Sequence, residues 1–150
     1  MLLRVLLDTN VLISYLLSSA RTTSAAGATV QAAIDGRYRL PFTVGVAEEL
    51  DRKLNERPDL AARIPRTDAA DLVALMDEVA DHLPRLPEPF PAIGRDRKDD
   101  FLIAHAIVAV ADLLVSWDKD LTDLVEVEGV RIVSPPEFLH ILRERGSRGQ

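Results

Sequence analysis

The stretch 95–121 constrains this chain most, because it places acidic residues at both ends of a long apolar segment. Asp99 stands where the apolar segment begins, and nearly every residue from 101 to 111 is apolar. This pattern predicts a helix buried on most of its circumference. A short strand is expected at 113–116, with Asp118 just beyond its carboxyl end. We expect the chemistry of the protein to lie at the acidic ends of these elements.

The N-terminus shows a related pattern. Residues 2–7 are nearly all apolar, and the run ends abruptly in Asp8, Thr9 and Asn10 before a second apolar run begins. A short apolar run of this length is typical of a strand buried on both faces of a parallel sheet. Asp8 would then lie at the carboxyl end of its strand, as Asp118 does.

Strand-like and helix-like segments alternate along the rest of the chain. Further strands are expected at 39–43 and 130–133. Helices are expected at 11–17, 25–34, 44–56, within 58–65, at 67–83, at 99–111 and from 135 onward. Alternation of this kind predicts a three-layer α/β fold with a mainly parallel central sheet of four to five strands and helices on both faces. Residues 84–91 would be a proline-rich connector, and 143–150 a flexible polar tail.

Length and composition favour one folded domain. A chain of 150 residues can bury roughly two thirds of the surface that it exposes when extended. The absence of cysteine excludes disulfides, thiolate catalysis and cysteine-based zinc sites. No uninterrupted apolar run approaches the ~20 residues of a membrane span. We therefore expect a cytoplasmic protein without a membrane segment.

The net charge of −6 argues against a protein that binds nucleic acid through a broad basic face. It does not exclude nucleic acid as a substrate. Clustered carboxylates lower the net charge, yet they create a phosphate-binding site once metal ions are bound.

Four acids are expected to converge at one edge of the sheet, because ligands of such sheets bind beyond the carboxyl ends of the strands. Asp8 and Asp118 lie at strand ends, and Asp99 lies early in its helix. Glu49 falls on the border of the apolar stripe of its helix, whereas Glu48 points nearly opposite that stripe. Each acid alone is more often a cap, a turn or a solvated residue. Four together at one predicted edge favour a shared site.

A carboxylate cluster is stable only when protons or cations neutralise it, and ligands that are all oxygen select Mg²⁺ or Mn²⁺. The natural chemistry of such a site is phosphodiester hydrolysis, which indicates a nuclease. His82, His105 and His140 lack the i, i+4 spacing of a zinc protease motif, and we interpret His105 as a hydrogen-bonded core histidine. The sequence also lacks G-x-S-x-G, a Walker A loop and a dinucleotide fingerprint.

Four stretches, at 1–14, 47–50, 96–106 and 111–121, together resemble the PIN domain family, in particular its toxin-type branch of VapC-like ribonucleases. The resemblance extends over about residues 2–135. It implies a Mg²⁺- or Mn²⁺-dependent endoribonuclease that acts on RNA, is often a homodimer and is commonly neutralised by a small antitoxin protein.

By position, the resemblance assigns catalytic and metal-binding roles to Asp8, Glu49, Asp99 and Asp118. Asn10 would support the first acid, and Ser116 precedes the fourth acid where the family has threonine or serine. Trp117 replaces a residue that is usually small, and Arg97 replaces a frequent proline. These two departures leave the acids intact but alter the mouth of the site.

Other polar residues flank the predicted acids. Asp100 and Asp120 can act as outer ligands that hold metal-bound water, or they can simply be solvated acids at helix starts. Candidate contacts to RNA phosphates are Arg95, Arg97, Lys98 and Lys119, although charge balance around the acids explains them too.

Three alternative functions are less well supported by the sequence. A metal-dependent phosphatase of the haloacid-dehalogenase type needs a second aspartate two positions after the first, where this chain has Asn10. A phosphorylation-receiver domain needs an adjacent acidic pair near the start of the chain, which Asp8 and its neighbours do not supply. A catalytically inactive module that binds RNA or protein is the third, and the presence of all four acids argues against it.

Overall fold

The computed structural model describes residues 2–18, 23–83 and 97–146, and it describes only the backbone of residues 43, 82–83 and 97–100. The predicted connector at 84–91, Arg95 and the end of the predicted tail at 147–150 lie outside the described residues.

A mainly parallel sheet forms the centre of the fold. Its strands, in spatial order, are β1 (Val5–Leu7), β4 (Leu113–Val115), β6 (Val130–Val133) and β5 (Glu126–Val127). The first three strands are parallel, and β5 runs antiparallel to β6. A second parallel pair, β2 (Pro41–Thr43) and β3 (Asp81–Leu83), continues the layer beyond β1 through an isolated bridge between Arg4 and Arg39.

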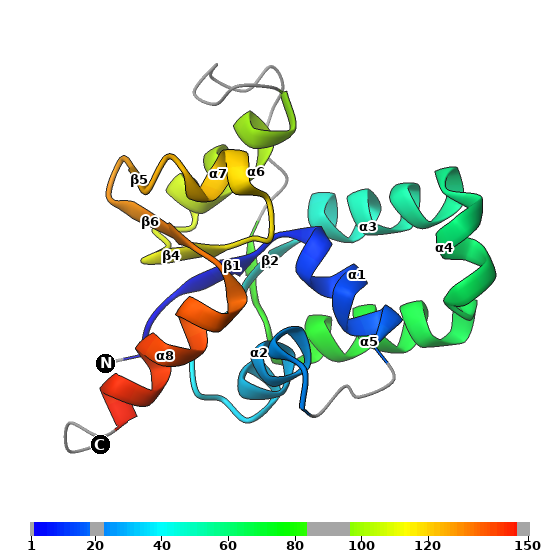
Figure 1. The fold of residues 1–150 in the computed structure, drawn as a ribbon, viewed down its shortest axis with the longest axis horizontal. Coiled ribbons are helices and arrows are strands. Elements are labelled where there is room, and N and C mark those ends of the chain that lie inside the picture. The colour runs from blue at the N-terminus through cyan, green and yellow to red at the C-terminus, as the bar shows by residue number, and fades with distance from the viewer. Residues whose placement is uncertain (1, 19–22, 84–96, 147–150) are drawn as a thin grey trace.

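Helices cover both faces of this sheet (Figure 1). They are α1 (Thr9–Leu17), α2 (Ala25–Ile34), α3 (Val44–Glu56), α4 (Pro58–Arg63), α5 (Arg66–Val79), α6 (Arg97–Val108), α7 (Lys119–Thr122) and α8 (Pro135–Gly146). In Figure 1, α6 and α7 lie on one side of β1, β4 and β6, and α1, α2 and α8 lie on the other. The predicted three-layer α/β fold is confirmed.

Alternation along the strands explains this arrangement, because successive side chains point to opposite faces. Val5 and Leu7 pack into a core with α1, α2, α3, α5 and α8, whereas Leu6 packs into a second core with α6 and α7. All three side chains are almost fully buried. Burying an aliphatic side chain of this size stabilises the fold by about 1.5–3 kcal/mol. The apolar run at 2–7 is therefore explained by cores on both faces.

Some element boundaries were predicted wrongly. The helix expected at 67–83 ends at Val79, and Asp81–Leu83 forms β3 instead. The backbone N–H of Asp81 donates to the carbonyl of Leu40, and the Asp81 carboxylate pairs with the guanidinium groups of Arg4 and Arg39. Contacts with distant segments thus override the local helical pattern.

Three smaller corrections concern the C-terminal half. The helix expected at 99–111 spans Arg97–Val108, and Val110 adopts a positive φ of 53° just after it. Neither the short helix α7 nor the edge strand β5 was expected. Residues 143–146, expected within the tail, form the last turn of α8. The predicted start of α8 is correct, since Ser134 precedes it and its Oγ accepts a hydrogen bond from the backbone N–H of Glu137.

Within the described part of the chain, every helix is too short or too polar to cross a membrane.

Candidate active site

The parallel pairing of β1 with β4 brings together residues that lie far apart in the sequence. Leu7 lies opposite Val115 in the parallel register, so Asp8 and Ser116 follow side by side at the carboxyl edge. The backbone N–H of Asp8 donates to the carbonyl of Val115 at 2.9 Å. The Oγ of Ser116 donates to Oδ2 of Asp8 at 2.7 Å. The sheet edge expected to carry the acids therefore does hold Asp8.

The Ser116 hydroxyl also connects the rest of this edge. Its Oγ accepts hydrogen bonds from Nδ2 of Asn10 at 3.2 Å and from the backbone N–H of Asp118 at 2.9 Å. The Oδ1 of Asn10 accepts from the backbone N–H of Trp117 at 3.2 Å. Asn10 and Ser116, two of the four predicted supporting residues, thus join Asp8 and the 116–118 turn into one hydrogen-bonded network.

Asp8 is a buried carboxyl group, with only 4% of its surface exposed. Burial raises its pKa, and the negative charge of Asp118 raises it further. The hydrogen bond from Ser116, the positive charge of Lys53 and the backbone N–H of Asn10 act in the opposite direction but do not cancel the burial. Such a carboxylate is stabilised by any cation that binds beside it.

Asp118 is half-buried and lies near enough to influence Asp8 electrostatically. Its carboxylate accepts a hydrogen bond from the backbone N–H of Asp120 and caps the N-terminus of α7. Asp120 itself is exposed in the first turn of that helix. Lys119, predicted as an RNA contact, is also exposed and lies 3.6 Å from a carboxylate oxygen of Asp123.

Glu49 is half-buried on α3, and Glu48 is exposed, as the position of the apolar stripe predicted. The two oxygens of Glu49 pair with Arg52 at 2.6 Å and with Lys53 at 3.8 Å. The ammonium group of Lys53 also donates to Oγ1 of Thr9 at 2.7 Å. Lys53 therefore links Glu49 to the start of α1, beside Asp8.

Lys53 was missed in the reasoning from the sequence. The available signal was its spacing of four residues from Glu49, which places both side chains on one face of α3. That spacing alone also describes an ordinary surface ion pair. Only the contact with Thr9 shows that the lysine reaches the acidic edge of the sheet.

The side chains of four predicted residues, Asp99, Asp100, Arg97 and Lys98, are not among those described, and only their backbone in the first turns of α6 is placed. The convergence of all four acids therefore stays a prediction. Among the described side chains, no three acidic or histidine groups lie close enough together to hold a metal ion. The oxygen donors of Asp8 and Asp118 nevertheless fit a hard divalent cation, because both carboxylates lie at the same edge and oxygen ligands are those that Mg²⁺ and Mn²⁺ prefer.

His105 lies in α6 and is buried, as expected for a core histidine. Its Nδ1 forms a 2.8 Å hydrogen bond with the carbonyl oxygen of Phe101, and burial lowers its pKa. The ring packs against the Phe101 ring with the centroids 4.2 Å apart. His105 is therefore confirmed as a hydrogen-bonded core residue.

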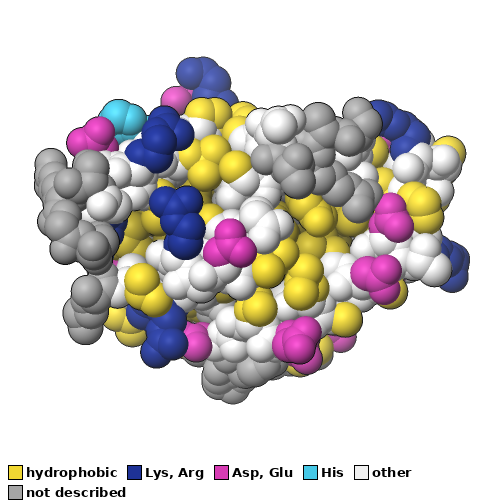
Figure 2. Space-filling view, turned by 90° about the horizontal axis from the view of Figure 1, so that it is seen from below, with side chains coloured by type: hydrophobic (Ala, Val, Ile, Leu, Met, Phe, Trp, Pro, Cys, Tyr) yellow, Lys and Arg dark blue, Asp and Glu magenta, His cyan; other side chains and the backbone are white. Residues whose placement is uncertain are grey.

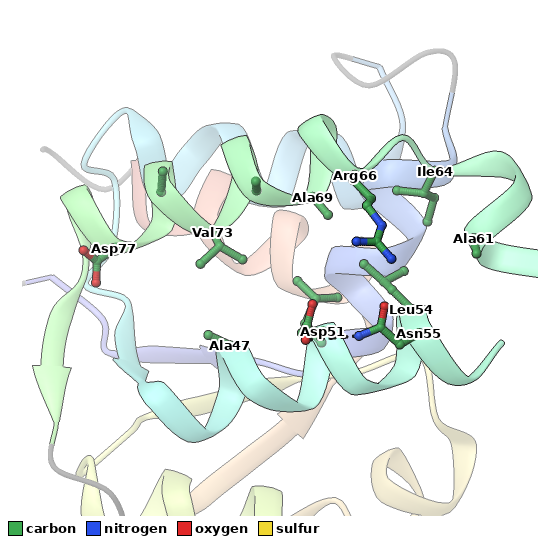
Figure 3. A pocket seen from close by; sticks show the side chains of 13 residues that line it. Ala47, Asp51, Leu54, Asn55, Ala61, Ile64, Arg66, Ala69, Val73 and Asp77 are labelled. Carbon is green, nitrogen blue, oxygen red and sulfur yellow. Dashed lines mark hydrogen bonds between the residues drawn. The ribbon is translucent and has the colours of Figure 1, made fainter. Parts of the chain in front are cut away.

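A groove of about 820 Å³ lies on a different face of α3, between that helix and α4 and α5 (Figure 3). Leu50, Leu54 and Val73 contribute apolar surface to it. Asp51 and Asn55 line it as a hydrogen-bonded pair, with Nδ2 of Asn55 3.2 Å from a carboxylate oxygen of Asp51. Glu49 and Lys53 are not among the lining residues, so this groove is separate from the carboxylate edge.

The sequence matches the PIN domain over residues 4–120, which is well over half of the chain. This protein belongs to the PIN domain family. The matched region includes Asp8, Glu49, Asp99 and Asp118, and therefore every acid predicted to be catalytic. PIN domains are usually nucleases, and PIN nucleases generally use divalent metal ions. A search of curated proteins found no match to the chain.

The surface of this PIN domain is mixed in charge on the face shown in Figure 2. Basic and acidic side chains lie interspersed around apolar surface there. The described residues on that face form no continuous basic stripe. Such a stripe would be needed to bind nucleic acid through its phosphates alone.

Proposed function

We propose that this PIN domain is a Mg²⁺- or Mn²⁺-dependent endoribonuclease that acts as the toxin of a toxin–antitoxin pair. The main support is the hydrogen-bonded network in which Ser116 connects the Asp8 carboxylate with the backbone of Asp118. It holds the Asp8 carboxylate and the backbone of Asp118 at the carboxyl edge of adjacent parallel strands, inside the region that matches the family.

In the proposed site, Asp8, Asp118, Glu49 and Asp99 hold the metal ion. A bound divalent ion would supply a water of lowered pKa and neutralise charge on the phosphoryl oxygens. Ser116 orients the Asp8 carboxylate, because its hydroxyl group donates to Oδ2 of Asp8. The other carboxylate oxygen, Oδ1, accepts from the Thr9 hydroxyl and from the backbone N–H of Asn10. Partners that orient a ligand in this way typically change metal affinity or activity by about 10–100-fold.

Asp8 contributes most as a ligand because it is buried. The same burial that raises its pKa removes water that would otherwise screen the attraction between carboxylate and cation. Lys53 supplies part of the neutralising charge before a metal ion binds. A bound metal ion and the Lys53 ammonium group would therefore compete to neutralise the Asp8 carboxylate.

Three parts of the proposal rest on the family resemblance: the toxin role, a small antitoxin as inhibitor and a homodimer as the assembly. In this proposal, a basic side chain of the antitoxin enters the acidic edge, because a guanidinium group can bridge carboxylates that would otherwise bind metal. Antitoxin binding should then compete with Mg²⁺.

One observation favours a second candidate, a catalytically inactive PIN module that binds RNA or protein. Glu49 forms ion pairs with Arg52 and Lys53, so its carboxylate is already neutralised by protein side chains. If these pairs persist in solution when metal is present, Glu49 is no ligand. A phosphatase of the haloacid-dehalogenase type is less well supported, because the side chain of Asn10, where that chemistry needs aspartate, is used to bind Ser116 and Trp117.

Cleavage of synthetic RNAs of several shapes, measured in EDTA and with Mg²⁺ or Mn²⁺ added, tests the proposal. Wild type should cut only with metal, and Asp8→Asn or Glu49→Gln should lower the rate by orders of magnitude, because each removes a proposed metal ligand. Glu48→Gln is the matched control, because Glu48 is exposed on the same helix. Binding of RNA without cleavage under every metal condition would support the inactive module instead.

A further inference from the structure

Trp117 is the one tryptophan of the chain, and it stands between Ser116 and Asp118. We propose that its indole stacks on an unpaired base of the substrate and so selects single-stranded RNA at this site. This inference deepens the proposed ribonuclease function and rests on it.

The position of Trp117 is set by the same network that fixes the acids. Its backbone N–H donates to Oδ1 of Asn10, and the hydroxyl of the preceding Ser116 binds Asp8. The side chain is 43% exposed, although tryptophan usually buries most of its large apolar surface. A hydrogen-bonded backbone therefore presents an exposed aromatic ring within one residue of a proposed metal ligand. Tryptophan loses little conformational freedom on binding, since it has only two side-chain torsions.

The described side chains at this edge offer little unpaired positive charge to RNA. The described cations on the helices that reach this edge are each paired with an acid: Lys53 and Arg52 with Glu49, and Lys119 with Asp123. The net charge of the chain is −6. Beyond the proposed metal ion, binding of a polyanion at this edge gains from an attraction that does not depend on charge. Stacking of a base on an aromatic ring is such an attraction.

The geometry of stacking selects the strand type. Bases within a duplex are paired and already stacked on one another, so their faces are not available to a protein side chain. Bases in loops, bulges and single strands expose their faces and can splay outward. Because Trp117 directly precedes Asp118, a base stacked on its ring would hold the RNA strand next to the acidic edge.

Because the chain has one tryptophan, its fluorescence reports on Trp117 directly. The experiment uses the Asp8→Asn protein, which the proposal makes inactive, with Mg²⁺ present. The probes are an unstructured 12-nucleotide RNA and the same RNA annealed to its complement. The Trp117 fluorescence should be quenched when the single-stranded RNA is added and should not be quenched by the duplex. Equal quenching by both, or none with the single strand, would overturn the inference.

Substitutions provide the second readout. In Trp117→Ala, the dissociation constant for the labelled single strand and the KM for cleavage should each rise about 10-fold, within the range for loss of one stacked base, while kcat stays near wild type. Trp117→Phe should restore most of the affinity because it keeps a ring. Leu2→Ala, a change of another exposed apolar residue that precedes β1, is the control and should alter neither.

The outcomes separate this inference from the proposed function. Normal metal-dependent cleavage with unchanged KM in Trp117→Ala overturns stacking and leaves the nuclease intact. Quenching by single-stranded RNA without cleavage by wild type overturns the nuclease and leaves stacking as a binding mode. Fluorescence that changes with protein concentration alone, and not with RNA, assigns Trp117 to a contact between protein molecules and overturns the inference.

Discussion

The Oγ of Ser116 donates a 2.7 Å hydrogen bond to Oδ2 of Asp8, although the two residues are 108 positions apart in the sequence. The parallel pairing of β1 with β4 creates this contact at the carboxyl edge of the sheet. It explains how a buried carboxylate is held in one orientation, and it leads to the first prediction.

Ser116→Ala should lower metal-dependent cleavage by about 10–100-fold, the range for loss of a residue that orients a metal ligand. The substitution removes a hydrogen bond that lowers the pKa of Asp8, so that pKa should rise further. The acid limb of the pH–rate profile should therefore move to higher pH. Ser116→Thr keeps the hydroxyl group and should remain near wild type. An unchanged profile in Ser116→Ala would show that the hydrogen bond does not act on the reaction.

Asp8→Asn should melt higher than wild type in EDTA at neutral pH. Burial raises the folded pKa of Asp8 above the ordinary value of 3.8, so the ionised group destabilises the fold. The penalty is absent below pH 3.8, grows as the pH rises toward the folded pKa and is complete above it. Thermal melts of both proteins across this range should therefore diverge with rising pH. A wild type that melts higher at neutral pH would mean that Lys53 and Ser116 outweigh the burial.

Asp99→Asn tests the acid whose side chain the structure does not describe. Added Mg²⁺ should stabilise wild type by mass action, by about 2.7 kcal/mol when the ion is at 100 times its dissociation constant. Removing a ligand weakens binding, so the same concentration should raise the melting temperature of Asp99→Asn much less. Melts with EDTA and with Mg²⁺ provide the measurement. If Mg²⁺ shifts both proteins alike, Asp99 is only an acid near the N-terminus of α6.

Lys53→Met should bind Mg²⁺ more tightly than wild type, because it removes a positive charge beside Asp8. A charge pair at about 4 Å is worth about 1 kcal/mol even in water, which corresponds to roughly a fivefold lower half-saturation concentration. Calorimetric titration with Mg²⁺ measures it. Arg57→Met is the control, since Arg57 is exposed and pairs with Asp59, which is not among the proposed ligands. Weaker Mg²⁺ binding by Lys53→Met would instead show that Lys53 acts mainly as a structural contact between α3 and Thr9.

Several features of this protein follow from the sequence alone. The apolar runs that end at Asp8 and just before Asp118 predicted strands with acids beyond their carboxyl ends, and the structure has β1 and β4 there. Helical periodicity correctly separated exposed Glu48 from half-buried Glu49. These features are local: a run of apolar residues or a spacing of 3.6 residues per turn carries the information without knowledge of distant segments.

Tertiary structure alone decided the rest, because it depends on which distant segments meet. Residues 81–83 became a strand since Leu40, Arg4 and Arg39 contact Asp81, and no pattern within the segment encodes that. Nor did any local pattern place Lys53 beside Thr9. The raised pKa of Asp8 likewise requires its burial under neighbours from other elements. A sequence specifies periodicity residue by residue, whereas desolvation and ion pairing are properties of the assembled edge of the sheet.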